Sequence, residues 1–179
     1  VFVDGEAGSE ADVREALAGL IGGLKGRVAV ACFASNVARM HSVINAAKAA
    51  GRRVCLVGRS MIRMASAARH VGLFDDVAEF VTEQQAGQFP ADQILYLCTG
   101  SQGEARAALS RIADGTHPHV KLGAGDACVF SSRVIPGNEV PIRNLQNKMA
   151  DRGVRLYTER DHPGIHVSGH PCRDELSRM

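Results

Sequence analysis

Residues 28–36 read VAVACFASN, and this stretch decides the fold. Its first six residues are apolar, which is typical of a strand that is covered on both faces of a parallel sheet. A serine and an asparagine follow at the point where a helical pattern begins, and both residue types are preferred at helix N-caps. A buried strand that leads directly into a helix indicates an α/β sheet.

The same unit recurs along the chain. Short apolar runs predict five strands, at Val28–Phe33, Val54–Val57, Ile94–Cys98, Ala127–Phe130 and Val154–Tyr157. The last of these runs alternates apolar and polar residues, as an edge strand does. Helical patterns separate the strands, and four of them end at a glycine suited to terminate a helix: Gly51, Gly72, Gly115 and Gly153.

The starts of two helices are also marked. A leading helix begins after Ser9, and Asp12 three residues later resembles a capping box. The helical pattern before Gly115 begins at Ala105. The pattern leaves open whether residues 74–92 hold an extra strand or an extra helix.

The sequence therefore predicts the α/β class: an open, mostly parallel, Rossmann-like sheet of about five strands with helices on both faces. We expect a single domain over residues 1–179. A leading segment and helix occupy residues 1–26, the α/β core residues 27–160, and a histidine-containing loop with a return segment residues 161–179.

Composition excludes several classes of protein. Of the 179 residues 45% are hydrophobic, yet no apolar run approaches the ~20 residues of a membrane span, and no signal segment opens the chain. The net charge is +2, so basic residues that bind nucleic acid have to be clustered rather than numerous. Tryptophan is absent and aromatics amount to 4%, which argues against extended base-stacking platforms.

The five cysteines include no C-x-x-C pair, and a reducing cytoplasm suits them. Cys172 adjoins histidines and is the one candidate for chemistry. The others lie in apolar runs and are expected to be small buried hydrophobic residues: Cys32, Cys55, Cys98 and Cys128.

Polar residues gather in the strand-to-helix loops, at the edge where open α/β sheets bind ligands. Helix N-termini and arginines there attract phosphate. Helix capping explains any single loop equally well, but five such loops on one edge favour anion binding. The polar residues in question are Ser35, Asn36, Arg59, Ser60, Thr99, Ser101, Gln102, Glu104, Ser131, Ser132, Arg133, His166, Ser168 and His170.

Two familiar nucleotide sites are excluded, since neither G-x-G-x-x-G nor G-x-x-x-x-G-K-[ST] occurs. His166 and His170 are four residues apart, but nearby glycines and Pro171 argue against the helix that would make them metal ligands. We expect no metal bound by this chain alone, and a phosphate-contacting or catalytic role for these two histidines. The remaining histidines are expected on the surface: His41, His70, His117 and His119.

The loops in this order resemble the ribonuclease J family. The motifs that carry the resemblance are FASN at 33–36, GRSM at 58–61, TGSQGE at 99–104, SSxxIPGN at 131–138 and HxSGH at 166–170. They cover nearly the whole chain. One departure lies at Ala105-Arg106, where members of the family have Pro-Met.

The resemblance implies a particular place in a larger enzyme. In the family, a metallo-β-lactamase domain with two zinc ions carries an inserted β-CASP domain, and RNA enters between them. This chain resembles the β-CASP domain only, because the His-x-His-x-Asp-His zinc motif is absent. We expect the flanking segments to belong to the missing domain.

The resemblance also implies roles for single residues. His170 matches a catalytic histidine that helps to hold the scissile phosphate, and His166, Ser168 and Gly169 match its surroundings. Ser35, Asn36, Arg59 and Ser60 match positions that cradle RNA at a 5′-monophosphate. Ser131 and Ser132 match positions near the same groove.

The expected function is endonucleolytic and 5′-to-3′ exonucleolytic RNA cleavage by the parent enzyme in the cytoplasm. Its partners would be 5′-monophosphorylated single-stranded RNA, the metallo-β-lactamase domain and further copies of the parent, with no membrane. Zinc would bind to the parent, and this chain alone would be inactive. A stand-alone phosphate- or RNA-binding module is the alternative, and a sugar-phosphate-binding α/β domain is a third hypothesis that leaves the motif series unexplained.

Overall fold

The computed structural model describes residues 8–168 and Cys172. Five strands form one sheet of order β2-β3-β1-β4-β5, and every neighbouring pair is parallel. The predicted strands are confirmed to within two residues at each end. They are β1 (Val28–Ala31), β2 (Arg53–Val57), β3 (Ile94–Cys98), β4 (Ala127–Phe130) and β5 (Arg155–Tyr157), with β5 at an edge as expected.

The helices of the described residues are α1 (Glu10–Gly22), α2 (Val37–Ala49), α3 (Arg59–His70), α4 (Glu83–Ala86), α5 (Ala108–Ala113) and α6 (Glu139–Asp151), with a 3₁₀ turn at Ala91–Gln93. Residues 74–92 thus contain the short helix α4 and a single bridge between Val81 and Cys55 of β2. None of the helices in the described part of the chain is long and apolar enough to cross a membrane.

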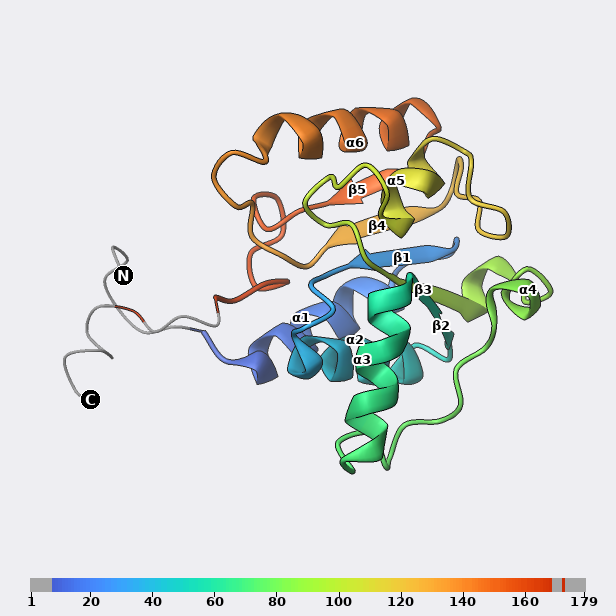
Figure 1. Cartoon of the computed structure of the whole chain (residues 1–179), viewed down its shortest axis with the longest axis vertical. Coiled ribbons are helices and arrows are strands. Elements are labelled where there is room, and N and C mark those ends of the chain that lie inside the picture. The colour runs from blue at the N-terminus through green and yellow to red at the C-terminus, as the bar shows by residue number, and fades with distance from the viewer. Residues whose placement is uncertain (1–7, 169–171, 173–179) are drawn as a thin grey trace.

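The sheet is covered on both faces, which confirms the predicted α/β architecture. In Figure 1, α1, α2 and α3 lie toward the bottom of the view and α6 at the top, while α5 overlaps β4 and β5. Apolar residues of α1, α2 and α3 pack in one cluster and those of α5 and α6 in another, so the two groups of helices cover opposite faces of the sheet. Alternate residues of each strand point to opposite faces, so both sets have to be apolar. This explains why the strands read as unbroken apolar runs.

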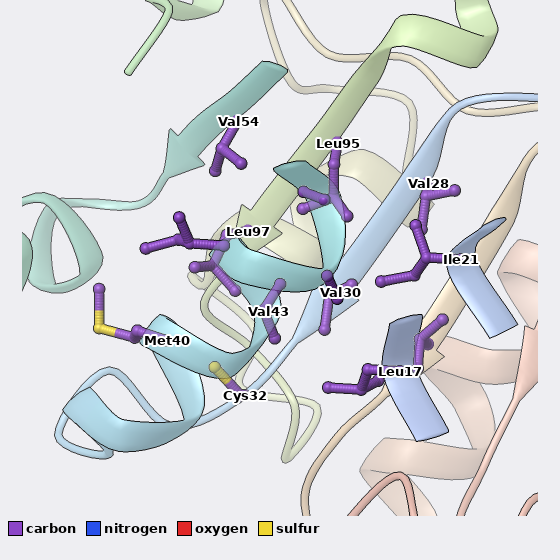
Figure 2. Packing of buried hydrophobic residues seen from close by; sticks show 14 of the residues in the cluster. Leu17, Ile21, Val28, Val30, Cys32, Met40, Val43, Val54, Leu95 and Leu97 are labelled. Atoms are coloured by element: carbon purple, nitrogen blue, oxygen red, sulfur yellow. The ribbon is translucent and has the colours of Figure 1, made fainter. Parts of the chain in front are cut away.

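Each face has its own apolar cluster. On the α1–α3 side, Val28, Val30, Leu95 and Leu97 of the sheet pack with Leu17, Ile21, Met40 and Val43 of the helices (Figure 2). On the other side, Ala29, Ala31 and Tyr96 pack with Leu109, Ile112, Leu145 and Met149. All five cysteines are buried and none forms a disulfide.

Helix ends follow the sequence signals closely. The Ser9 hydroxyl accepts from the Asp12 amide (3.1 Å) and the Asp12 carboxylate from the Ser9 amide (3.0 Å), which is the predicted capping box. The glycines after α2, α3, α5 and α6 have φ of +69°, +81°, +72° and +79°, a conformation that only glycine adopts without strain.

The predicted start of α5 is wrong by three residues. The helix begins at Ala108 rather than Ala105. The amide of Leu109 donates to the carbonyl of Thr99 (3.0 Å), which ties the start of the helix to the end of β3. Residues 104–107 therefore form a turn before the helix.

Arg52 lies at the opposite edge of the sheet, where the strands begin, and stabilises the backbone there. Its guanidinium is buried, with 5% of the residue exposed, and donates to four carbonyls. The acceptors are Leu24 after α1 (2.5 Å), Gly26 before β1 (2.9 Å), Ile94 of β3 (3.1 Å) and Ala91 (3.2 Å). One side chain thus joins the exit of α1 to the entries of two strands.

Replacing Arg52 by methionine is expected to destabilise the fold by about 2–3 kcal/mol, because two buried and two partly buried carbonyls would lose this donor. Arg53, its exposed neighbour, is the matched control, and Arg53→Met should cost less than about 0.5 kcal/mol. Urea unfolding of both variants measures the difference. Equal midpoints for the two variants would contradict this role of Arg52.

Candidate nucleic-acid interface at the carboxyl edge of the sheet

Because all five strands run in the same direction, the loops that leave them begin at one edge, called the carboxyl edge below. The loop after β1 contains Ser35 and Asn36, and the turn after β2 leads into Arg59 and Ser60. The loop after β4 begins with Ser131 and Ser132, and the chain after β5 contains His166 and Ser168. Gly169 and His170 lie outside the described residues.

A buried arginine on α2 connects two of these segments to the start of α1. Arg39 is 1% exposed. Its Nε and Nη2 donate to the carboxylate of Glu10 at the start of α1 (2.6 and 3.1 Å). Its Nη1 donates to the carbonyl and hydroxyl oxygens of Ser131 (3.0 and 2.9 Å) and to Nδ1 of His166 (2.9 Å).

The same guanidinium reaches the next residue of the histidine loop. Nη2 of Arg39 donates to the carbonyl of Val167 at 3.3 Å. The Ser131 hydroxyl donates to the carbonyl of Ile165 at 2.7 Å. Arg39 and Ser131 together therefore fix the course of residues 165–167 at the carboxyl edge.

This arrangement determines the tautomer of His166. A guanidinium can only donate, so Nδ1 of His166 accepts and its proton lies on Nε2. Burial lowers the pKa of His166, and the positive charge of Arg39 lowers it further. The imidazole is therefore held neutral, with Nε2–H as its one donor.

The hydroxyl group of Ser131 has less capacity to bind a ligand than the sequence suggests. It is 2% exposed, its only proton is given to Ile165, and its oxygen accepts from Arg39. The hydroxyl can still accept, but it has no proton left to donate to a phosphate. In this geometry Ser131 shapes the loop.

The loop after β1 shows one of the two functions that the sequence left open. The Asn36 side chain accepts from the Arg39 amide (2.9 Å) and so caps α2. Capping is thus what the Asn36 carboxamide oxygen does, and phosphate binding there stays a prediction. The neighbouring Ser35 is exposed.

Gln102, a residue to which the sequence assigned no role, braces the loop after β4. Its amide nitrogen donates to the carbonyl of Arg133 (2.9 Å) and lies 3.4 Å from the Ser132 hydroxyl. Its oxygen accepts from the Ile135 amide (3.0 Å) and from Asn138 (3.3 Å). Ser132 is held in this way at the rim of a hollow.

That hollow has a volume of about 680 Å³ and lies between the loop after β4, α6 and the chain after β5. Its charged lining residues are Arg133, Glu139, Arg143, Glu159 and Arg160. Arg59 and Ser60 line a different hollow, of about 490 Å³, on the β2–β3 side of the edge. Several of the predicted phosphate-binding residues thus lie in separate places. Arg59 and Ser60 line one hollow and Ser132 the other. Ser131 and His166 belong to a cluster with Arg39 and Glu10, called the Arg39 cluster below.

One expectation about the histidines is wrong. His117, predicted on the surface, is 4% exposed, and its ring accepts from backbone amides of its own turn. His41 lies at the surface, with 34% of its side chain exposed, and it pairs with Asp76 at 3.2 Å and stacks on Phe74.

Within residues 8–168 and Cys172, no group of three or more His, Cys, Asp or Glu side chains is placed to hold a metal ion. The described residues therefore do not fit a zinc centre. Cys172 is buried, and a chemical role for it stays a prediction.

Comparison with known proteins gives one consistent result. Residues 25–149 match the family model described as "Ribonuclease J, beta-CASP domain". The chain is 46% identical over 176 residues to ribonuclease J of Sinorhizobium meliloti, which is 98% of this chain and 31% of that protein. It is 42% identical over 173 residues to ribonuclease J of Mycolicibacterium smegmatis, with 96% of this chain and 31% of that protein covered.

Ribonuclease J of Synechocystis is also similar, with 39% identity over 176 residues. That match covers 97% of this chain and 27% of the cyanobacterial protein. The chain thus spans less than a third of the length of these curated relatives.

Proposed function

The chain belongs to the ribonuclease J family as its β-CASP domain, and from this premise we propose that it positions RNA by its phosphates beside the catalytic centre of a metal-dependent ribonuclease. The observation that carries the proposal is the Arg39 cluster. It fixes the segment that leads to the histidine motif, and it leaves His166 with a neutral Nε2–H donor at the carboxyl edge.

The chemistry available at this edge suits a phosphodiester. Nε2–H of His166 would donate to a non-bridging phosphate oxygen, and the exposed Arg133 would add a charged donor beside Ser132. His170, by its match to the family motif, would donate to the oxygen on which negative charge develops during cleavage. Each of these donors acts on a phosphate, so the domain binds and orients RNA without base recognition.

The finer features of the parent enzyme are part of the proposal. We assign it endonucleolytic and 5′-to-3′ exonucleolytic cleavage of 5′-monophosphorylated single-stranded RNA in the cytoplasm, with zinc as cofactor. The metal ligands would come from a metallo-β-lactamase domain outside this chain, since the described residues do not fit a metal centre. The chain alone would be inactive, and the parent would assemble into homo-oligomers.

A matched pair of arginines tests whether RNA follows the carboxyl edge. Arg133 is exposed beside Ser132, and Arg53 is exposed at the opposite edge, where β2 begins. In the full-length protein, Arg133→Gln should reduce the slope of log affinity against log salt by about 0.7, the value for one phosphate contact with a single strand. Arg53→Gln should leave the slope unchanged.

The measurement is fluorescence anisotropy with a 5′-monophosphorylated oligonucleotide after chelation of metal ions, so that the RNA is not cut. A slope that falls for Arg53→Gln and not for Arg133→Gln would place the RNA at the wrong edge for this proposal.

A further inference from the structure

A short segment at the carboxyl edge, residues 133–140 and called the apolar loop below, exposes several apolar side chains. Six large apolar side chains of the described residues are exposed, and three of them belong to this segment. They are Val134 (44% exposed), Ile135 (47%) and Val140 (54%). Single exposed apolar residues are ordinary, but a group of them on one short segment indicates a surface that a partner covers.

The backbone of the apolar loop is fixed, so these side chains cannot turn inward. The buried Gln102 donates to the carbonyl of Arg133 (2.9 Å) and accepts from the amide of Ile135 (3.0 Å). It also accepts from the Asn138 side chain (3.3 Å), and the Asn138 amide donates to the carbonyl of Ile135 (3.0 Å). Because the loop is already ordered, a partner that docks on it loses little free energy to ordering.

The chemistry of the apolar loop suits a protein surface and not an RNA strand. Valine and isoleucine side chains have no hydrogen-bond donor for a phosphate, and they lack the aromatic face on which bases stack. Protein interfaces have apolar centres and polar rims. In the apolar loop, Val134 and Ile135 lie between the exposed charged residues Arg133 and Glu139. The expected occupant is therefore another protein surface.

The place of the apolar loop in the fold indicates which protein surface covers it. Ser131, just before the loop, accepts from Arg39, and the same guanidinium contacts Glu10 and Val167. Gly8 packs on Val167 so closely that an added Cβ would lie 2.7 Å from its Cγ1. In Figure 1, the start of α1, the chain after β5 and the loop between β4 and α6 lie on the same side of the view. Chain attached to either end of residues 8–168 is thus tethered near the apolar loop.

A tethered occupant also fits the size of the surface. The chain spans less than a third of the length of its curated relatives, so most of the full-length protein lies outside residues 1–179. A free second copy has to bury about 800 Å² on each partner to bind stably, which is more than three side chains supply. A tethered part is present at an effective concentration of about 1 mM or more, so a small apolar contact is enough to hold it.

We propose that the apolar loop is the docking surface for the remainder of the same polypeptide, with Ile135 at its centre. This contact sets the distance between the carboxyl edge, which carries Arg133 and His166, and the catalytic centre. The inference rests on the proposed function in one respect, since it takes the docked part to be the one that holds the metal ions.

Photo-crosslinking in the full-length protein tests the docking directly. One sample carries p-benzoylphenylalanine in place of Ile135, and the control carries it in place of Val71, which is exposed at the end of α3. Both are irradiated with the 5′-monophosphorylated oligonucleotide present and metal ions chelated. Mass spectrometry should show position 135 joined to a peptide of the same molecule that lies outside residues 1–179. Position 71 should not be joined to that peptide.

The other products of irradiation would each overturn the docking. A product of twice the mass would make the apolar loop a surface between copies of the protein. A product that contains the oligonucleotide would make it an RNA contact. Cross-links from position 135 to residues 1–179 alone, or a yield no higher than at position 71, would leave the loop without the proposed occupant.

Activity provides a second readout of the same contact. Ile135→Asp should lower kcat by about 10-fold, part of the ~10²-fold that a misplacement of about 1 Å can cost, with the salt slope of RNA binding unchanged. Val71→Asp should leave kcat unchanged. Unmodified kcat in Ile135→Asp would refute the claim that the contact sets the distance to the catalytic centre.

Comparison with Arg133→Gln separates failure of the docking from failure of the proposed function. If the cross-link at position 135 does not form and Arg133→Gln lowers the salt slope, the docking is refuted and the proposed function stands. If the cross-link forms and Arg133→Gln has no effect on RNA binding, the docking surface stands and the placement of RNA at this edge is refuted.

Discussion

Replacing Arg39 by methionine is expected to lower kcat of the full-length protein by about 10²-fold. Arg39 touches residues 166 and 167, so its loss would release the segment that leads to the histidine motif. Misplacing a reacting group by about 1 Å costs on the order of 10²-fold in rate. RNA affinity should change less than kcat, because the exposed arginines that contact phosphates remain.

The same substitution should destabilise the protein by about 2–4 kcal/mol. Removing one partner of a buried ion pair usually costs about 3–5 kcal/mol. The side chain of Glu10 is 29% exposed and can be hydrated once Arg39 is gone. We therefore expect a loss of stability near or below the lower end of this range. Arg63→Met, at an exposed position of α3, is the control and should cost less than about 0.5 kcal/mol.

Two further measurements separate positioning from simple loss of stability. Arg39→Lys retains the charge, but the three donors of an ammonium lie on one nitrogen and cannot replace the six contacts that the guanidinium makes, so kcat should recover little. In Arg39→Met the pKa of His166 should rise, because a charge that lowers it is removed. Wild-type kcat in an Arg39→Met protein that is folded at the assay temperature would contradict the positioning role.

The fold was predictable because its signals are local. Both faces of the sheet are covered, so the strands read as apolar runs, and glycines with positive φ end four of the helices. The start of α5 was not predictable, since it is set by bonds to Thr99 at the end of β3. Helix α4 has only four residues, too few for a periodic pattern.

The carboxyl edge could also be predicted, because parallel strands place their loops together. The hydrogen bonds between the side chains at this edge could not be predicted. Arg39 is separated from Glu10, Ser131 and His166 by 29, 92 and 127 residues, and an arginine on a helix is ordinarily a surface residue. No local pattern distinguishes it from the exposed Arg63.

His117 was misplaced for a related reason. A histidine in a turn with proline is usually exposed, and here the ring is buried because it accepts the amides of its own turn. The separation of Arg59 from Ser132 into two hollows depends on how α5 and α6 pack, which loop sequences do not encode.

His170 is the residue on which the proposed catalytic role depends most. It follows Gly169 in the S-G-H motif, and glycine has no side chain to crowd a phosphate. Arg39 fixes the chain at Val167, three residues earlier. Removing a donor that acts on charge developing in the transition state costs about 10²–10³-fold in turnover, so His170→Ala should lose that much.

The control for His170 has to be a histidine without contacts that matter for stability. His41 is unsuitable, because it pairs with Asp76 and stacks on Phe74. His70 is exposed in the last turn of α3, and His70→Ala should leave turnover unchanged.

The single-turnover rate of His170→Ala in the full-length protein is therefore the most direct test of the claim that this domain positions RNA phosphate for cleavage. With a 5′-monophosphorylated oligonucleotide, the rate should fall by about 10²–10³-fold, while metal content, melting temperature and RNA affinity stay close to those of the unmodified protein. A rate near that of the unmodified protein, or a loss of activity that follows unfolding alone, would contradict the claim.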